Sequence, residues 1–199
     1  MNSLLLSGTI AYSYSRGLSV VDTNWSNIRS DPELGWRIAC AYLSAPNILT
    51  PEAAYSYEAL CAEMWDQFEY LTSVIGIEVR VVDEDPYSRA SELHADLDKG
   101  LLRVWATAAG NNSHPYFSHD ANDVFRAVHD AFGHGSIGSS FGPNGEEAAW
   151  VKHSQMFSPA AQPAMTTETR GQTCTFLYGN DGKFFSEQKA ILLPSEFWP

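Results

Sequence analysis

The feature that most constrains the fold is a long helical pattern between residues 51 and 75. Pro51 occupies a position that the first turn of a helix tolerates. Apolar residues then recur three or four positions apart: Leu60, Met64, Phe68 and Leu71. This spacing predicts an amphipathic helix, and an apolar stripe of that length has to be covered by other elements of the chain.

Further helical patterns follow along the chain. They occupy residues 86–100, 120–132 and 144–157, each with apolar residues at helical spacing or a typical terminating residue. Pro163 opens a further short helix, which is expected to end at Gly171. The core of the protein is therefore expected to be mostly helical.

Extended segments are fewer. β-branched residues predict strands at 77–83 and 101–108, which we expect to pair, whereas residues 34–43 fit either a helix or a strand. An Asn-Asp-Gly turn between aromatic runs predicts a hairpin in residues 173–185. With 44% hydrophobic residues, the chain is expected to form a single domain, residues 1–199, of the α+β class: predominantly helical, with a small antiparallel sheet or hairpins.

The charge balance limits the partners. The 12 Lys and Arg residues against 24 Asp and Glu give a net charge of −12, which argues against binding to nucleic acid or to an anionic membrane surface. The N-terminal sequence has neither a basic stretch nor a long apolar run, so we expect no signal peptide and no membrane span. The three cysteines lack metal-type spacing and fit free thiols. We therefore expect a cytoplasmic protein whose ligands are small molecules.

The sequence HDAFGHG, residues 129–135, places His129 and His134 five positions apart. In a straight α-helix, such residues are separated by about 140° around the axis, too far to share an ion. A π-type turn would reduce this angle to about 50°. Alternatively, a helix that ends at Gly133 would let His134 turn back toward His129. Either geometry would allow the pair to bind one metal ion, and the alternative is that His129 packs in the core while His134 caps the C-terminal end of the helix.

A third protein ligand is expected among Glu146, Glu147 and Glu168. Glu147 follows Asn144 by three residues, which resembles a capping box at a helix start. Glu146 shares a helix face with His153, and these two residues could pair with one another. Glu168 lies in the polar run MTTETRGQ and has no comparable local explanation beyond a solvated short helix.

The segment NDVFRAVHDAFGH, residues 122–134, resembles the metal-binding motif of the pterin-dependent aromatic amino acid hydroxylases. That family carries H-E-L-L-G-H, with two histidines five apart and Gly before the second. A Glu in a Thr-x-Glu context follows a few dozen residues later. Thr166-Thr167-Glu168 fits this context in order and approximate spacing, and the resemblance covers about residues 120–172. The block 145–172 also resembles uncharacterised microbial and phage proteins.

The resemblance implies that His129, His134 and Glu168 hold Fe(II) as a 2-His-1-carboxylate triad, with open positions for O2 and substrate. Asp130 replaces the family's Glu and would act beside the ligands, on an imidazole or a backbone amide. The family's segments that bind the pterin and the substrate carboxylate have no recognisable counterpart upstream, so the implied cofactor is iron rather than a pterin. The hypothesis is a non-haem iron oxygenase or hydroxylase of a small, aromatic or amino-acid-like substrate.

Substrate contacts are expected near the third ligand. Arg170 could form a bidentate pair with a substrate carboxylate, or instead a salt bridge with a nearby acidic side chain of the chain itself. Trp150 and His153 are expected at the walls of the pocket, with core packing as the alternative for Trp150.

Three other hypotheses remain open. An HD-type phosphohydrolase would use His129-Asp130 with an upstream histidine and Asp181 around one or two metal ions. The upstream candidates are His94, His114 and His119. A zinc hydrolase would use the same two histidines and one Glu, with Glu147 or Glu146 as the general base. A non-enzymatic binding protein would instead use its acidic surface and its aromatic residues.

Overall fold

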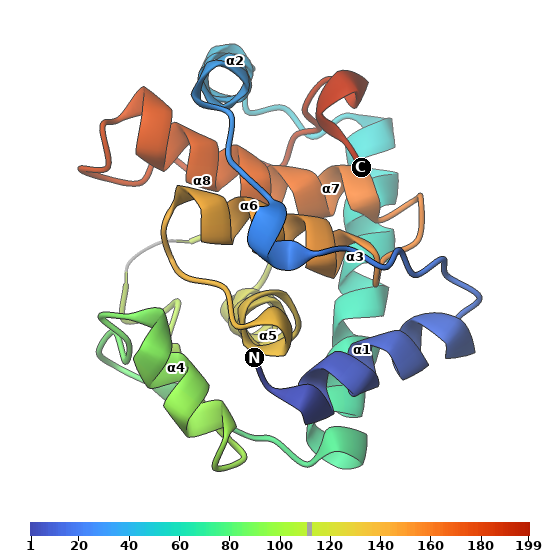
Figure 1. Cartoon of the computed structure of the whole chain (residues 1–199). Helices are drawn as coiled ribbons and strands as arrows, with labels where there is room; N and C mark the ends of the chain where they lie inside the picture. The colour runs from blue at the N-terminus through green and yellow to red at the C-terminus, as the bar shows by residue number, and fades with distance from the viewer. Residues whose placement is uncertain (111–112) are drawn as a thin grey trace.

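The computed structural model describes residues 1–110 and 113–199, and it is predominantly helical (Figure 1). The α-helices are α1 (Ser3–Ser15), α2 (Pro32–Ser44), α3 (Pro51–Glu69), α4 (Ala90–Leu97), α5 (His119–Val128), α6 (Pro143–Ser154), α7 (Gln162–Thr166) and α8 (Gln172–Cys174). Within the described residues, four π-helical turns continue from α-helices: η2 (Tyr70–Ile75), η3 (His129–Gly135), η4 (Thr167–Gly171) and η5 (Thr175–Gly179). Short 3-10 turns are η1 (Trp25–Asn27) and η6 (Ser195–Phe197).

Side-chain caps explain where the longer helices begin. Asn2, Asp31, Thr50 and Ser118 each accept a hydrogen bond from a backbone amide of the following first turn. The ambiguous segment 34–43 is therefore helical, because it lies inside α2 behind such a cap. The helix expected across 51–75 is also present, although its last six residues form the π-helical turn η2.

The expected pair of strands is present, but the sheet is parallel rather than antiparallel. β1 (Glu78–Val82) pairs with β2 (Leu101–Trp105), with Glu78 opposite Leu101 and Val82 opposite Trp105. The helix α4 lies between the two strands in the sequence. It returns the chain to the end of the sheet at which β1 begins. A crossover of this kind makes neighbouring strands parallel, whereas a hairpin would make them antiparallel.

The hairpin expected in residues 173–185 is wrong, because the first part of this segment is helical. α8 and η5 place Cys174 and Tyr178 one turn apart, and both pack against the face of α2 that carries Ile38. The contact is close: a Cβ atom at Gly35 would lie 2.3 Å from the ring of Tyr178. The Asn-Asp-Gly sequence forms a turn only after this helical segment ends, with positive φ at Asp181 and Gly182.

Helix α5 lies at the centre of the molecule (Figure 1). Its buried residues join those of α3, α6 and α7 in the main apolar core. The π-helical turn η3 continues from α5 and packs against α6, so the HDAFGHG segment is held inside the helical core. Among the described residues, none of the helices combines the length and the apolar composition needed to cross a bilayer.

Candidate metal centre

The HDAFGHG segment forms the π-helical turn η3, which is the first of the two geometries that the five-residue spacing allows. The wider turn brings His129 and His134 to one side of the helix, with ring centroids 5.2 Å apart. Gly133 permits close packing within this turn, because a Cβ atom there would lie 3.3 Å from Ala149 and from the ring of His129. The same glycine does not end the helix.

The protonation of His129 follows from a chain of hydrogen bonds behind its ring. The amide nitrogen of Gln67 donates a hydrogen bond to the carbonyl of Met156 at 3.0 Å. The amide oxygen of Gln67 therefore faces Nε2 of His153, at 2.8 Å. Nε2 of His153 therefore carries the proton, and its Nδ1 accepts from Nδ1 of His129 at 3.2 Å. This arrangement leaves Nε2 of His129 without a proton, so this nitrogen can ligate a metal ion.

Burial keeps both of these imidazoles neutral. It lowers the pKa of His153 to about 3 and lowers the pKa of His129 well below its ordinary value, with the neighbouring histidines acting in the same direction. A neutral imidazole is the form that binds metal ions.

His134 is anchored in a similar way. Its Nδ1 lies 2.9 Å from the hydroxyl of Ser139, and its Nε2 lies 3.6 Å from Oε1 of Glu146. Burial lowers the pKa of His134, but the Glu146 carboxylate, Asp130 and the backbone of Ser140 together outweigh it, so the pKa lies above its ordinary value. Glu146 reaches the histidine from the first turn of α6, where no side chain caps the helix.

His129, His134 and Glu146 together form a three-residue cluster, with one ligand atom from each within 4.8 Å of the others. Two neighbouring ligands at about 2.1 Å from one ion lie about 3.0 Å apart in an octahedral site and about 3.4 Å apart in a tetrahedral site, so small side-chain shifts would suffice to bind a metal. The cluster lines a cavity of about 250 Å³. The centre is therefore accessible to a small ligand.

Asp130 lines the same cavity, and no hydrogen bond to its carboxylate is found among the described residues. Burial raises its pKa to about 6, and the nearby Glu146 carboxylate adds to this effect. Asp130 therefore lies beside the cluster, and its role next to metal ligands stays a prediction.

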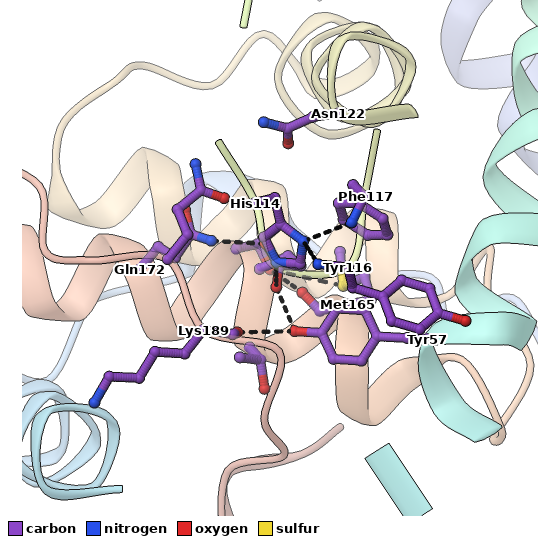
Figure 2. A network of polar contacts seen from close by, with 12 residues as sticks. Tyr57, His114, Tyr116, Phe117, Asn122, Met165, Gln172 and Lys189 are labelled. Atoms are coloured by element: carbon purple, nitrogen blue, oxygen red, sulfur yellow. Dashed lines mark hydrogen bonds and ion pairs between the residues drawn. The ribbon is translucent and has the colours of Figure 1, made fainter. Parts of the chain in front are cut away.

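Glu168 lies outside the cluster, although it lines the same cavity. Its carboxylate accepts hydrogen bonds from the hydroxyl of Tyr57, from Nε2 of His114 at 3.0 Å and from the amide of Gln172 at 2.7 Å, and these three donors are labelled in Figure 2. The carboxylate that joins the two histidines is thus Glu146, one of the two alternatives to Glu168. The Thr-x-Glu spacing could not show which glutamate joins the two histidines, because this depends on the direction of the side chain. In the structure, η4 directs the Glu168 side chain toward α3 and the 113–118 segment.

The other expected site residues lie behind or beside the cavity. Arg170 forms a bidentate ion pair with Glu147, at 2.6 and 3.1 Å, and its guanidinium stacks on Trp150 at 4.0 Å. Trp150 donates to the hydroxyl of Thr166 at 3.2 Å. Of the residues expected to contact substrate, Arg170, Trp150 and His153 are absent from the described lining of the cavity. Arg170 thus takes its alternative role, the internal salt bridge.

Asp181, expected in an HD-type arrangement, is not part of the three-residue cluster among the described residues, whereas His94, one of the three upstream histidines, lies near His134. His114 bonds to Glu168, His119 lies near Ser113, and Asp181 pairs with Lys183. Glu147 does not complete a capping box with Asn144, because α6 begins at Pro143 and Asn144 accepts a bond from Ser30 instead.

Several residues of the site could not be recognised in the sequence. Gln67 and Ser139 orient the two histidines from α3 and from the loop before α6, and neither belongs to a motif. Phe141 lies edge-on to the His134 ring, with centroids 5.2 Å apart. The sequence indicated Glu146 only through its helical spacing from His153, which in the structure contacts His129.

No protein-family model, no curated protein and no solved structure matches this chain.

Proposed function

We propose that the protein is a mononuclear metal enzyme that uses His129, His134 and Glu146 as a 2-His-1-carboxylate triad, and that its physiological metal is Fe(II). The observation that carries this proposal is the cluster itself: three ligand atoms within 4.8 Å at the wall of a cavity. The reaction we propose is the O2-dependent oxidation of a small organic substrate.

The donor set is compatible with iron. Two imidazoles and one carboxylate on one side of an ion, with open positions on the other, are typical of non-haem Fe(II) oxygenases. Zinc can use the same ligands, and iron is distinguished by its redox chemistry and not by its ligands. When bound, Fe(II) would supply the activation of O2, while the protein supplies binding, orientation and exclusion of water.

The residues of the chain have distinct roles in this proposal. His153 and Gln67 hold His129 with Nε2 toward the metal, and Ser139 holds His134. Asp130 lies at the cavity as a carboxyl group that could accept or release a proton near the metal. The cavity admits the substrate next to the open side of the triad.

Metal analysis provides the first test. We expect anaerobic reconstitution with Fe(II) to give one iron per chain, and Glu146→Gln and His134→Ala to lose this metal. Glu147→Gln is the matched control, because Glu147 is the adjacent residue on α6 but pairs with Arg170. Full metal content in Glu146→Gln, or no metal in the wild-type protein, would refute the proposed site.

Spectroscopy tests the proposed iron chemistry separately. Nitric oxide binds to open positions on Fe(II) in place of O2, so the iron-loaded protein should give the electron paramagnetic resonance signal of an iron–nitrosyl adduct. A protein that binds zinc stoichiometrically, but gives no nitrosyl adduct when loaded with Fe(II), would instead support the zinc hydrolase.

A further inference from the structure

Glu168 is a buried residue that lines the same cavity as the metal cluster. Its side chain is 1% exposed, and it receives hydrogen bonds from Tyr57, His114 and Gln172. The three donors are a hydroxyl, an imidazole and an amide, so this network places no permanent positive charge opposite the Glu168 carboxylate.

The adjacent histidine does not provide that charge. Nδ1 of His114 accepts hydrogen bonds from the backbone amides of Tyr116 and Phe117, at 3.0 and 2.9 Å (Figure 2). An imidazole nitrogen that accepts two such bonds carries no proton, so His114 is neutral and donates from Nε2 alone. The contact between His114 and Glu168 is a hydrogen bond between a neutral ring and an anion.

Apart from the contact with the neutral ring of His114, no basic side chain among the described residues pairs with Glu168. Lys189 extends away from His114 in Figure 2 and donates to three backbone carbonyls at the end of α2. Arg170 is paired with Glu147, and Arg126, which lines the cavity, donates to the carbonyl of Trp105 at 2.9 Å. An uncompensated buried charge is costly, and a cationic ligand would offset that cost.

The rest of the cavity favours the same type of ligand. Asp130 and Glu146 add negative charge to its wall, and a divalent metal at the cluster would compensate Glu146. Phe125, Phe141 and Phe185 provide apolar surface that suits hydrocarbon and, through cation–π contact, an ammonium group. A carboxylate ligand would meet three acidic side chains and a single guanidinium.

We propose that Glu168 binds the protonated amine of the substrate, a small primary amine with an apolar body. This inference rests on the proposed function for the reaction at the metal, whereas amine binding requires only the cavity and the Glu168 carboxylate. It assigns Glu168 to the substrate instead of to the metal.

The test compares benzylamine with benzyl alcohol, two probes of nearly equal shape that differ in charge. Dissociation constants are measured by calorimetry on the protein before and after incubation with Fe(II). We expect benzylamine to bind at least about tenfold more tightly, the effect of one charge-assisted hydrogen bond in a buried site. The preference should vanish in Glu168→Gln and persist in part in Glu168→Asp, while Glu147→Gln should retain it.

The outcomes distinguish this inference from the proposed function. Equal binding of the two probes, or no binding of benzylamine to the folded wild-type protein, would overturn the amine site and leave the metal site intact. Loss of metal from a folded Glu168→Gln variant would also overturn it, because Glu168 would then be a metal ligand. A wild-type protein that binds no metal but prefers benzylamine through Glu168 would refute only the metal function. Cooperative thermal unfolding and the near-ultraviolet circular dichroism of each variant verify its fold.

Discussion

Nδ1 of His129 lies 3.2 Å from Nδ1 of His153, and the opposite nitrogen of the His153 ring lies 2.8 Å from the amide oxygen of Gln67. This series of hydrogen bonds fixes both the orientation and the tautomer of His129. Hydrogen bonds of this kind position metal-binding histidines without touching the metal themselves. His153 is therefore a positioning residue.

We expect His153→Leu to weaken metal binding by about 10- to 100-fold, because His129 would lose the partner that keeps its proton on Nδ1. Competition with a chromogenic chelator measures this affinity. His119→Gln is the control, since His119 is exposed and lies outside the cluster. An unchanged affinity in His153→Leu would contradict the orienting role.

Two glycine substitutions separate packing at the metal centre from packing elsewhere. A Cβ atom at Gly145 would lie 2.0 Å from the backbone oxygen of Ser140, so Gly145→Ala must displace the start of α6, where Glu146 is located. A Cβ atom at Gly35 would meet the ring of Tyr178 at 2.3 Å. We expect each alanine to lower the free energy of unfolding by about 1–3 kcal/mol, which chemical denaturation measures.

Metal affinity should distinguish these two variants. Gly145→Ala should lose affinity because it moves Glu146, whereas Gly35→Ala should retain it because it disturbs the contact between α2 and η5. Equal affinities would mean that the start of α6 does not position the ligand.

The ion pair between Arg170 and Glu147 is expected to stabilise the fold and not the metal site. Both side chains are largely buried, 10% and 18% exposed, and removing one partner leaves the other charge without compensation. We expect Arg170→Met to lower the free energy of unfolding by about 2–4 kcal/mol, and the double variant with Glu147→Gln to recover part of that loss. A stable Arg170→Met protein that no longer binds benzylamine would instead support substrate contact by Arg170.

The sequence predicted the helical character of the chain, the two strands and the histidine pair, because each depends on residues that are close together along the chain. It did not predict the direction of the second strand, which α4 determines, or the helical form of residues 173–179, which depends on packing against α2. The choice between Glu146 and Glu168 depends on how α6 and η4 face the cavity. Gln67 lies 86 residues from His153, so no local pattern could have identified their contact.

Lys152 gives the fold a pH dependence of known sign. The residue is 2% exposed, and burial lowers the pKa of its ammonium to about 8, below the ordinary 10.5. The unfolded chain therefore binds this proton more tightly than the folded chain. The resulting cost to stability is fully present below about pH 8, decreases as the pH rises, and disappears above about 10.5.

We expect Lys152→Met to raise the free energy of unfolding at pH 7 by about 1–3 kcal/mol, because the apolar chain keeps the packing and removes the buried charge. Contact between the ammonium and the Trp25 ring, 5.5 Å from its centroid, offsets part of the gain. Urea denaturation of both proteins at pH 7 and pH 9.5 measures the difference, in which other titrating groups cancel. The advantage of the variant should shrink at the higher pH, and a variant that is less stable than the wild type at pH 7 would show that the cation–π contact outweighs the cost of burial.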